Sequence, residues 1–210
     1  MKLTRDRIVD AGMQAFAERG YAGMSMRQLA ETLDVHAGSL YYHVKNKEQL
    51  LALLAERVAD EAYTAGTAAL AQLPADAPWP DKIEAQLTAL RASLLARTGA
   101  PALLAASPAL LSDASLGLME RLQETLVDAG IAPAERGMAA DTLMSYVTGF
   151  VLQEQTDAFP RGLADEARIA ELAGRYPLTF SGRGPNPDAM FQRSLRMLCG
   201  GIATLVGAPA

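Results

Sequence analysis

The chain has 210 residues, half of them apolar, and a formal net charge of −5. A chain of this length can bury a sizeable core in one or two domains, and its negative charge argues against a protein that binds nucleic acid over its whole surface. The first 50 residues nevertheless hold seven Lys and Arg against six Asp and Glu, whereas the remaining 160 hold twelve against eighteen. This distribution favours a protein that contacts phosphate through one small N-terminal surface.

The apolar residues recur at helical spacing, and the sequence contains no alternating β-branched stretch bounded by turns. We therefore expect an all-α protein. No stretch approaches eighteen consecutive apolar residues, and the charged N-terminus lacks the apolar segment of a secretory signal. The single cysteine, Cys199, cannot form an intrachain disulfide and is expected to be a small buried residue. These features predict a soluble, cytoplasmic protein with no membrane partner.

The N-terminal segment predicts three short helices. The first begins after its cap, Thr4, and ends at Gly20. Ser25 caps the second, and Gln28, three residues later, completes the pattern of a capping box. The third covers residues 36–44, and its first turn contains only small side chains after His36.

The second and third of these helices form the pattern of a helix-turn-helix. Asp34 and Val35 break the apolar run between them. Such a unit inserts its second helix into the major groove of DNA, where small residues in the first turn allow close approach to the bases. The sequence therefore predicts a DNA-reading head.

A long helix is predicted from Asn46, its cap, to about Ala71, with Gln49 completing a second capping box. At ~1.5 Å per residue such a helix reaches well beyond a head of fifty residues. We expect it to connect a DNA-binding domain of residues 1–47 to a body of residues 48–210.

The body is expected to be helical throughout most of its length. Helices are predicted over residues 81–97, 112–129, 134–156 and 187–206, the last with Asn186 as its cap. A section broken by prolines follows residue 97, and residues 174–187 are predicted to form an irregular loop.

Several segments resemble the tetracycline-repressor (TetR) family of bacterial transcription regulators. They are Gly20-Tyr21, SMRQLA at 25–30 and LYYHVKNK at 40–47, the last being close to the tetracycline-responsive branch. A weaker likeness continues through Trp79, TGFVLQEQ at 148–155 and FQRSLRMLCGGI at 191–202. The resemblance implies a dimeric repressor that binds a palindromic double-stranded DNA operator and is released by a small-molecule effector.

The candidate DNA contacts come from groove chemistry and from the resemblance together. Ser39 can bond to base edges, Ala37 could touch a thymine methyl, and Lys47 suits a phosphate at a helix N-terminus. The family uses the arginine corresponding to Arg27 for guanine and the corresponding aromatic residues for phosphates and bases. The candidate DNA-binding residues are Ser25, Arg27, His36, Ala37, Gly38, Ser39, Tyr41, Tyr42, His43 and Lys47.

Two predicted helices of the body, residues 134–156 and 187–206, match the positions through which the family dimerises as a four-helix bundle. Small residues on both helices suit close packing of this kind. Both helices could instead belong to the core of a single chain. We favour the homodimer, because two long apolar stripes would otherwise be exposed on a small body.

The resemblance also implies a ligand cavity in the body. In the tetracycline repressor a histidine of this domain holds a magnesium–drug chelate, whereas this chain has both of its histidines in the head. Leu103 or a neighbour occupies the matching place, and Tyr63 stands where another ligand-contacting histidine would be. We therefore expect a hydrophobic or aromatic effector without a metal. The candidate ligand-binding residues are Tyr63, Gln86, Leu90, Leu103, Leu104, Ala106, Met119, Leu122 and Phe150.

Two alternatives remain at this stage. One is an all-α enzyme, although the sequence contains no metal-ligand spacing, nucleophile motif or phosphate loop, and we expect no catalytic residue, metal site or cofactor. The other is a DNA-binding regulator without a small-molecule ligand, which would share the head and differ only in the body.

Overall fold

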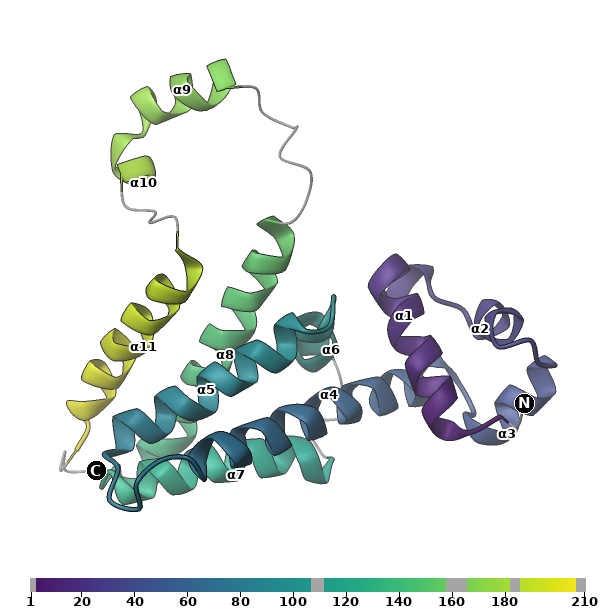
Figure 1. The fold of residues 1–210 in the computed structure, drawn as a ribbon, viewed down its shortest axis with the longest axis horizontal. Coiled ribbons are helices and arrows are strands. Elements are labelled where there is room, and N and C mark those ends of the chain that lie inside the picture. Colours follow the sequence, from purple (N-terminus) through teal and green to yellow (C-terminus); the bar gives the residue numbers. More distant parts are fainter. Residues whose placement is uncertain (1–2, 107–111, 158–165, 182–185, 207–210) are drawn as a thin grey trace.

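The computed structural model describes residues 3–106, 112–157, 166–181 and 186–206. These residues form helices and no β-strand, so the all-α prediction is confirmed (Figure 1). The helices are α1 (Arg5–Gly23), α2 (Met26–Thr32), α3 (Ala37–His43), α4 (Lys47–Leu70), α5 (Trp79–Leu95), α6 (Ala100–Ala106), α7 (Asp113–Asp128), α8 (Pro133–Asp157), α9 (Glu166–Arg175), α10 (Pro177–Ser181) and α11 (Pro187–Ala203).

The predicted caps of the head are present. The Thr4 hydroxyl accepts a hydrogen bond from the Arg7 N–H, and Gly20, at φ 64°, interrupts α1 where the helix was expected to end. The Ser25 hydroxyl accepts the Gln28 N–H at 3.2 Å. The Gln28 side chain accepts from the Ser25 hydroxyl at 2.9 Å rather than from its backbone N–H, so the capping box is only half formed.

The turn between α2 and α3 sets the angle of the helix-turn-helix. Asp34 adopts φ 52°, a left-handed conformation that aspartate tolerates better than most residues. Leu40 and Val44 are fully buried on the side of α3 that faces α1 and α2. The opposite side of α3 is therefore left in solvent.

Helix α4 connects the head to the body, as predicted. Asn46 caps it by accepting the Gln49 N–H at 2.8 Å, and the Gln49 side chain reaches back to the Lys45 N–H at 2.7 Å, one residue before the one expected for a capping box. The helix leaves the head and runs beside α5 and α7 (Figure 1).

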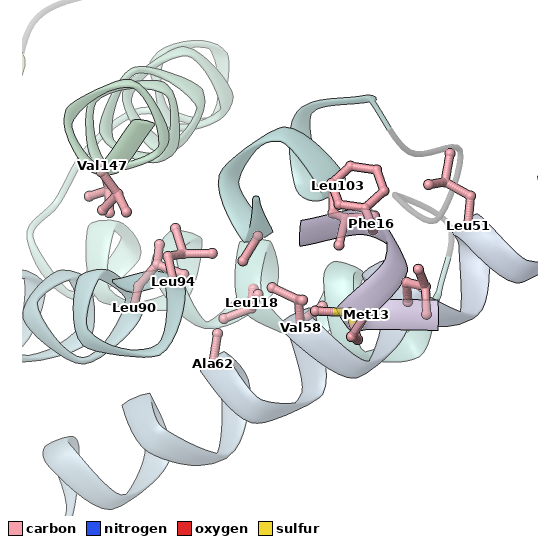
Figure 2. Packing of buried hydrophobic residues seen from close by; sticks show 14 of the residues in the cluster. Met13, Phe16, Leu51, Val58, Ala62, Leu90, Leu94, Leu103, Leu118 and Val147 are labelled. Atoms are coloured by element: carbon pink, nitrogen blue, oxygen red, sulfur yellow. The ribbon is translucent and has the colours of Figure 1, made fainter. Parts of the chain in front are cut away.

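Head and body share one continuous core. Gly12 of α1 lies so close to α4 that an added Cβ would be 3.0 Å from Leu54. About one turn further along α1, Phe16 packs against the turn before α6, where an added Cβ on Gly99 would be 3.0 Å from its ring. Figure 2 shows the buried side chains in one series, from Met13 and Phe16 past Val58 to Leu94 of α5.

Three parts of the body differ from the sequence prediction. The section around Pro101 is helical over α6, because proline is compatible with the first turn of a helix. The irregular loop predicted over residues 174–187 is wrong in part, since α10 forms a short helix within it. Helix α9 was not predicted at all. It has no buried residue, and with α10 it extends away from the rest of the body (Figure 1).

A buried arginine holds α5, α8 and α11 together. The Arg91 guanidinium forms two hydrogen bonds with the Glu154 carboxylate, at 2.6 and 2.8 Å, and a third to Asp188 at 2.7 Å. It also lies over the rings of Phe150 and Phe191. The hydrogen bonds to Glu154 raise the pKa of Arg91, so this cation is permanent.

Arg91→Met is expected to destabilise the fold by about 3 kcal/mol, because Glu154 would remain largely buried without its counter-ion. The measurement is denaturant unfolding followed by circular dichroism. Arg57→Met is the matched control: its partners Asp6 and Asp10 are exposed, so the loss should stay below ~1 kcal/mol. If both variants lost the same free energy of unfolding, burial would not distinguish the two ion networks.

The expected burial of Cys199 is confirmed, since the residue is 6% exposed on α11. Burial raises the pKa of its thiol to about 11. An unfolded thiol ionises at about pH 8.5, so this group contributes stability that is complete below that pH and is lost as pH rises through its folded pKa.

Cys199 is therefore expected to resist alkylation by iodoacetamide at about pH 8 in the native protein and to react rapidly in denaturant, because only the thiolate is nucleophilic. Mass spectrometry of timed samples provides the rates. Equal rates with and without denaturant would contradict the burial of this thiol.

Candidate nucleic-acid interface and ligand cavity

The solvent-facing side of α3 carries small residues followed by two tyrosines. All four residues from His36 to Ser39 are exposed, and an added Cβ on Gly38 would meet no atom within 4 Å. Tyr42 is 87% exposed and Tyr41 48% exposed. A large aromatic residue in this position adds nothing to the core, so it is available to a partner.

Further predicted DNA contacts lie on α2, at the end of α3 and in the first turn of α4. Arg27 on α2 is largely exposed, and its Nε donates to Glu31 at 3.1 Å. Lys47, in the first turn of α4, places its Nζ 4.1 Å from the centroid of the Tyr21 ring. The His43 ring meets Tyr42 edge-on, with the centroids 5.4 Å apart.

Ser25 is already engaged within the head. Its hydroxyl accepts from the Gln28 N–H and donates to the Gln28 side chain. A phosphate could receive this donor only if the Gln28 side chain turned away. Arg27 and Lys47, in contrast, keep charge on the surface beside α3, which suits an anionic partner.

The predicted ligand residues do not come together around one cavity. Leu90, Leu103 and Leu122 are fully buried in the packed core, whereas Tyr63 is partly exposed on α4. Phe150 packs in the aromatic cluster beside Arg91. Only Leu104 and Met119 line the cavity described below. Ala106 ends α6, and its side chain lies outside the described residues.

An arginine that the sequence analysis missed fills the space between α4, α5 and α7. Arg121 donates to the Tyr63 carbonyl and the Thr67 hydroxyl, both at 2.7 Å, and to the Gln86 side chain at 3.0 Å. Gln86 in turn donates to Thr125 at 2.9 Å. Burial lowers the pKa of Arg121. This polar network joins the three helices and engages Gln86, one of the predicted ligand residues.

The sequence contains a signal for this network. Arg121 lies three residues after Leu118 and one before Leu122, on the apolar stripe of α7. A cation in such a stripe must either reach solvent or find polar partners inside. Gln86, on the facing helix, is the partner that the sequence analysis assigned to a ligand instead.

A cavity of about 640 Å³ lies between α6, α7 and α8. Its walls are mainly apolar, and most of them come from one face of α8. This volume is within the range of small-molecule sites in proteins. The lining residues are Leu104, Ala105, Ser115, Leu118, Met119, Asp141, Met144, Ser145, Thr148, Gly149 and Leu152.

Within the described ranges, no three His, Cys, Asp or Glu side chains come together as metal ligands. A search of the same residues finds no helix with the length and apolar character that a membrane span requires.

Comparisons with known proteins find relatives along the whole chain. Residues 8–54 match bacterial regulatory proteins of the tetR family, and residues 73–206 match the tetracyclin repressor-like C-terminal domain. An HTH-type transcriptional regulator of Saccharopolyspora erythraea is 33% identical, over 98% of this chain and 86% of its own length. Tetracycline repressor protein class C from Escherichia coli is 30% identical, over 96% of this chain and 91% of its own. The crystal structure of BioQ with its double-stranded DNA operator is 27% identical, with a TM-score of 0.66, and the match covers 97% of this chain and 99% of that one.

Proposed function

We propose that this chain, which belongs to the TetR family of bacterial regulatory proteins, is a dimeric repressor that binds a double-stranded operator and leaves it when a small effector enters its body. The observation that carries the proposal is the exposed face of α3, which has small residues in its first turn and two tyrosines after them. The next helix, α4, extends from this unit into the body and packs there. A chain of this family is a regulator and not an enzyme. Its DNA partner implies a cytoplasmic location.

In the operator complex, α3 enters the major groove. The backbone at Gly38 approaches the bases, Ser39 reads a base edge, and Tyr42 reaches bases or phosphates beside them. Arg27 donates to a guanine after releasing Glu31, and Lys47 binds a phosphate. Ser25, His36, Ala37, Tyr41 and His43 complete the proposed surface within a DNA-binding domain of residues 1–47.

Dimerisation is assigned to α8 and α11. The two helices pack against each other and leave apolar side chains in solvent, with Met197 71% and Met138 55% exposed. At Gly200 and Gly201 an added Cβ would meet no atom within 4 Å. Such a surface allows a second copy to approach closely, and a two-fold dimer presents two α3 helices to a palindrome.

The effector cavity is assigned to the space between α6, α7 and α8, in the domain of residues 48–210. Leu104 and Met119 are the predicted ligand residues that line it. Its apolar walls support a hydrophobic or aromatic effector. This cavity favours a ligand-responsive regulator over one that binds DNA alone.

A set of direct contacts supports coupling between the cavity and the head. Gln155 lies one helical turn after Leu152, which lines the cavity. Its side chain donates to the Leu94 and Arg97 carbonyls and accepts the Gly99 N–H, each at 3.0 Å. Gly99 lies against Phe16 of the head. A ligand that moves α8 would shift this turn, and with it the distance between the two reading heads.

Arg27→Ala and Tyr42→Ala are each expected to weaken operator binding by about 30-fold or more, since a base contact is lost in both half-sites. Fluorescence anisotropy with the intergenic DNA upstream of the gene is the measurement. Arg175→Ala and Tyr176→Ala remove the same side-chain types from exposed positions of the body and should bind normally. Wild-type affinity in both head variants would rule out this reading surface.

Gly149→Leu tests the cavity. The added side chain meets open space and lines the cavity, so it should weaken the affinity for a neutral aromatic dye such as Nile red by ~10-fold or more. The substitution also replaces a helical glycine by a better helix former. Gly137→Leu makes the same change at an open position of α8 outside the lining. Dye titrations of both variants provide the comparison. Undiminished binding to Gly149→Leu would place the dye elsewhere.

A further inference from the structure

We infer that the effector of this regulator is an organic cation with a flat apolar body, and that Asp141 is the residue that selects its charge. The inference rests on the proposed function, because it concerns the same cavity. It goes further because it assigns a positive charge to the effector, whereas the apolar walls alone predict only an apolar or aromatic ligand.

Asp141 brings a negative charge to the cavity wall without a counter-ion. Among the described residues its carboxylate takes part in no ion pair or side-chain hydrogen bond. The residues three and four positions away on α8 are Gly137, Met138, Met144 and Ser145, none of them basic. No neighbour on its own helix can therefore neutralise this carboxylate.

Two basic residues lie on the three helices that line the cavity, Arg121 of α7 and Arg136 of α8. Arg121 of α7 donates to Gln86 and to the carbonyl of Tyr63. Arg91 of α5 is held by Glu154. Arg136 comes five residues before Asp141, which places it about 140° around the helix and outside the cavity lining.

The rest of the lining has no charged side chain. Ser115, Ser145 and Thr148 offer hydroxyl groups, and the remaining contacts are mostly aliphatic or thioether. Met119 and Met144 are flexible and polarisable, which suits the face of an aromatic ring. A ligand with a charged amine at one edge and an aromatic body would match both parts of the wall.

Electrostatics then decides between ligand classes. Asp141 is exposed to solvent, so a ligand that covered its carboxylate would remove water from it. This desolvation is unfavourable unless the ligand supplies a positive charge. An anionic ligand would add repulsion to the desolvation. The excess of acidic residues after residue 50 acts in the same direction over longer distances, because it attracts cations to the body.

Three acridines of nearly equal shape test this assignment at pH 7: 9-aminoacridine, which is a cation; acridine, which is neutral; and acridine-9-carboxylate, which is an anion. Fluorescence titration of the full-length protein should show affinity falling in that order, with the cation bound at least ~10-fold more tightly than neutral acridine. In Asp141→Asn this preference should disappear while the affinity for neutral acridine is unchanged. Asp76→Asn, the same change at an exposed position outside the cavity, should keep the wild-type order.

Each other outcome contradicts a defined part of the argument. If the three acridines bind equally to the wild-type protein, or if Asp141→Asn keeps the preference, the charge assignment is wrong and the cavity remains. If Nile red binds and no acridine does, the ligand class is wrong. If Gly149→Leu leaves the binding of Nile red and all three acridines unchanged, the cavity itself is wrong, and the proposed function loses its effector site.

Discussion

Helix α4 packs against α1 of the head and against α5, α6 and α7 of the body, and this double packing fixes the head relative to the body. Its first turns are buried against α1, where Gly12 permits close contact with Leu54. Its later turns are buried against α5 and α7. Because one rigid helix is part of both cores, the head cannot turn freely on the body. A change in the body must therefore reach α3 as a displacement of the whole head.

Two further contacts strengthen this connection. Arg57 of α4 binds Asp6 and Asp10 of α1, and Arg97, after α5, forms two hydrogen bonds with Glu61 of α4. The Arg97 segment is also the one that Gln155 of α8 holds. The turn between α5 and α6 thus contacts the head, the connector α4, and α8, the helix that lines the cavity. These contacts join α8, which lines the proposed cavity, to Phe16 of the head.

The position of the cavity follows from the buried polar network around Arg121. A guanidinium that donates to α4 and α5 fills the middle of the body with satisfied hydrogen bonds. The proposed effector cavity lies beyond α7, between α6 and α8, where Asp141 and Met144 are found. A ligand that enters there contacts α8, which we also assign to the dimer interface. Effector binding and subunit contact would therefore act on the same helix.

Local features of the fold could be predicted from the sequence, because they depend on neighbours within a few residues. The caps at Thr4, Ser25 and Asn46 are present, and so is the turn at Asp34 that separates the two helices of the reading unit. The exposed face of α3 follows directly from the apolar residues on its other side. Helix α9 was missed, although Ile169 and Leu172 have helical spacing; no residue of this helix is buried, and it contacts the short helix α10.

The sequence by itself determined the helical class, the DNA-reading head and the long connector, since periodicity and capping are local properties. Only the tertiary structure decided where the body is hollow. Leu90 and Leu122 are apolar residues that could equally line a cavity or fill a core, and their burial depends on helices distant in sequence. The same is true of charge, as Arg121 of α7 and Asp141 of α8 show. Packing surrounds the first with hydrogen-bond acceptors and leaves the second without a counter-ion on a cavity wall, and no local pattern records that difference.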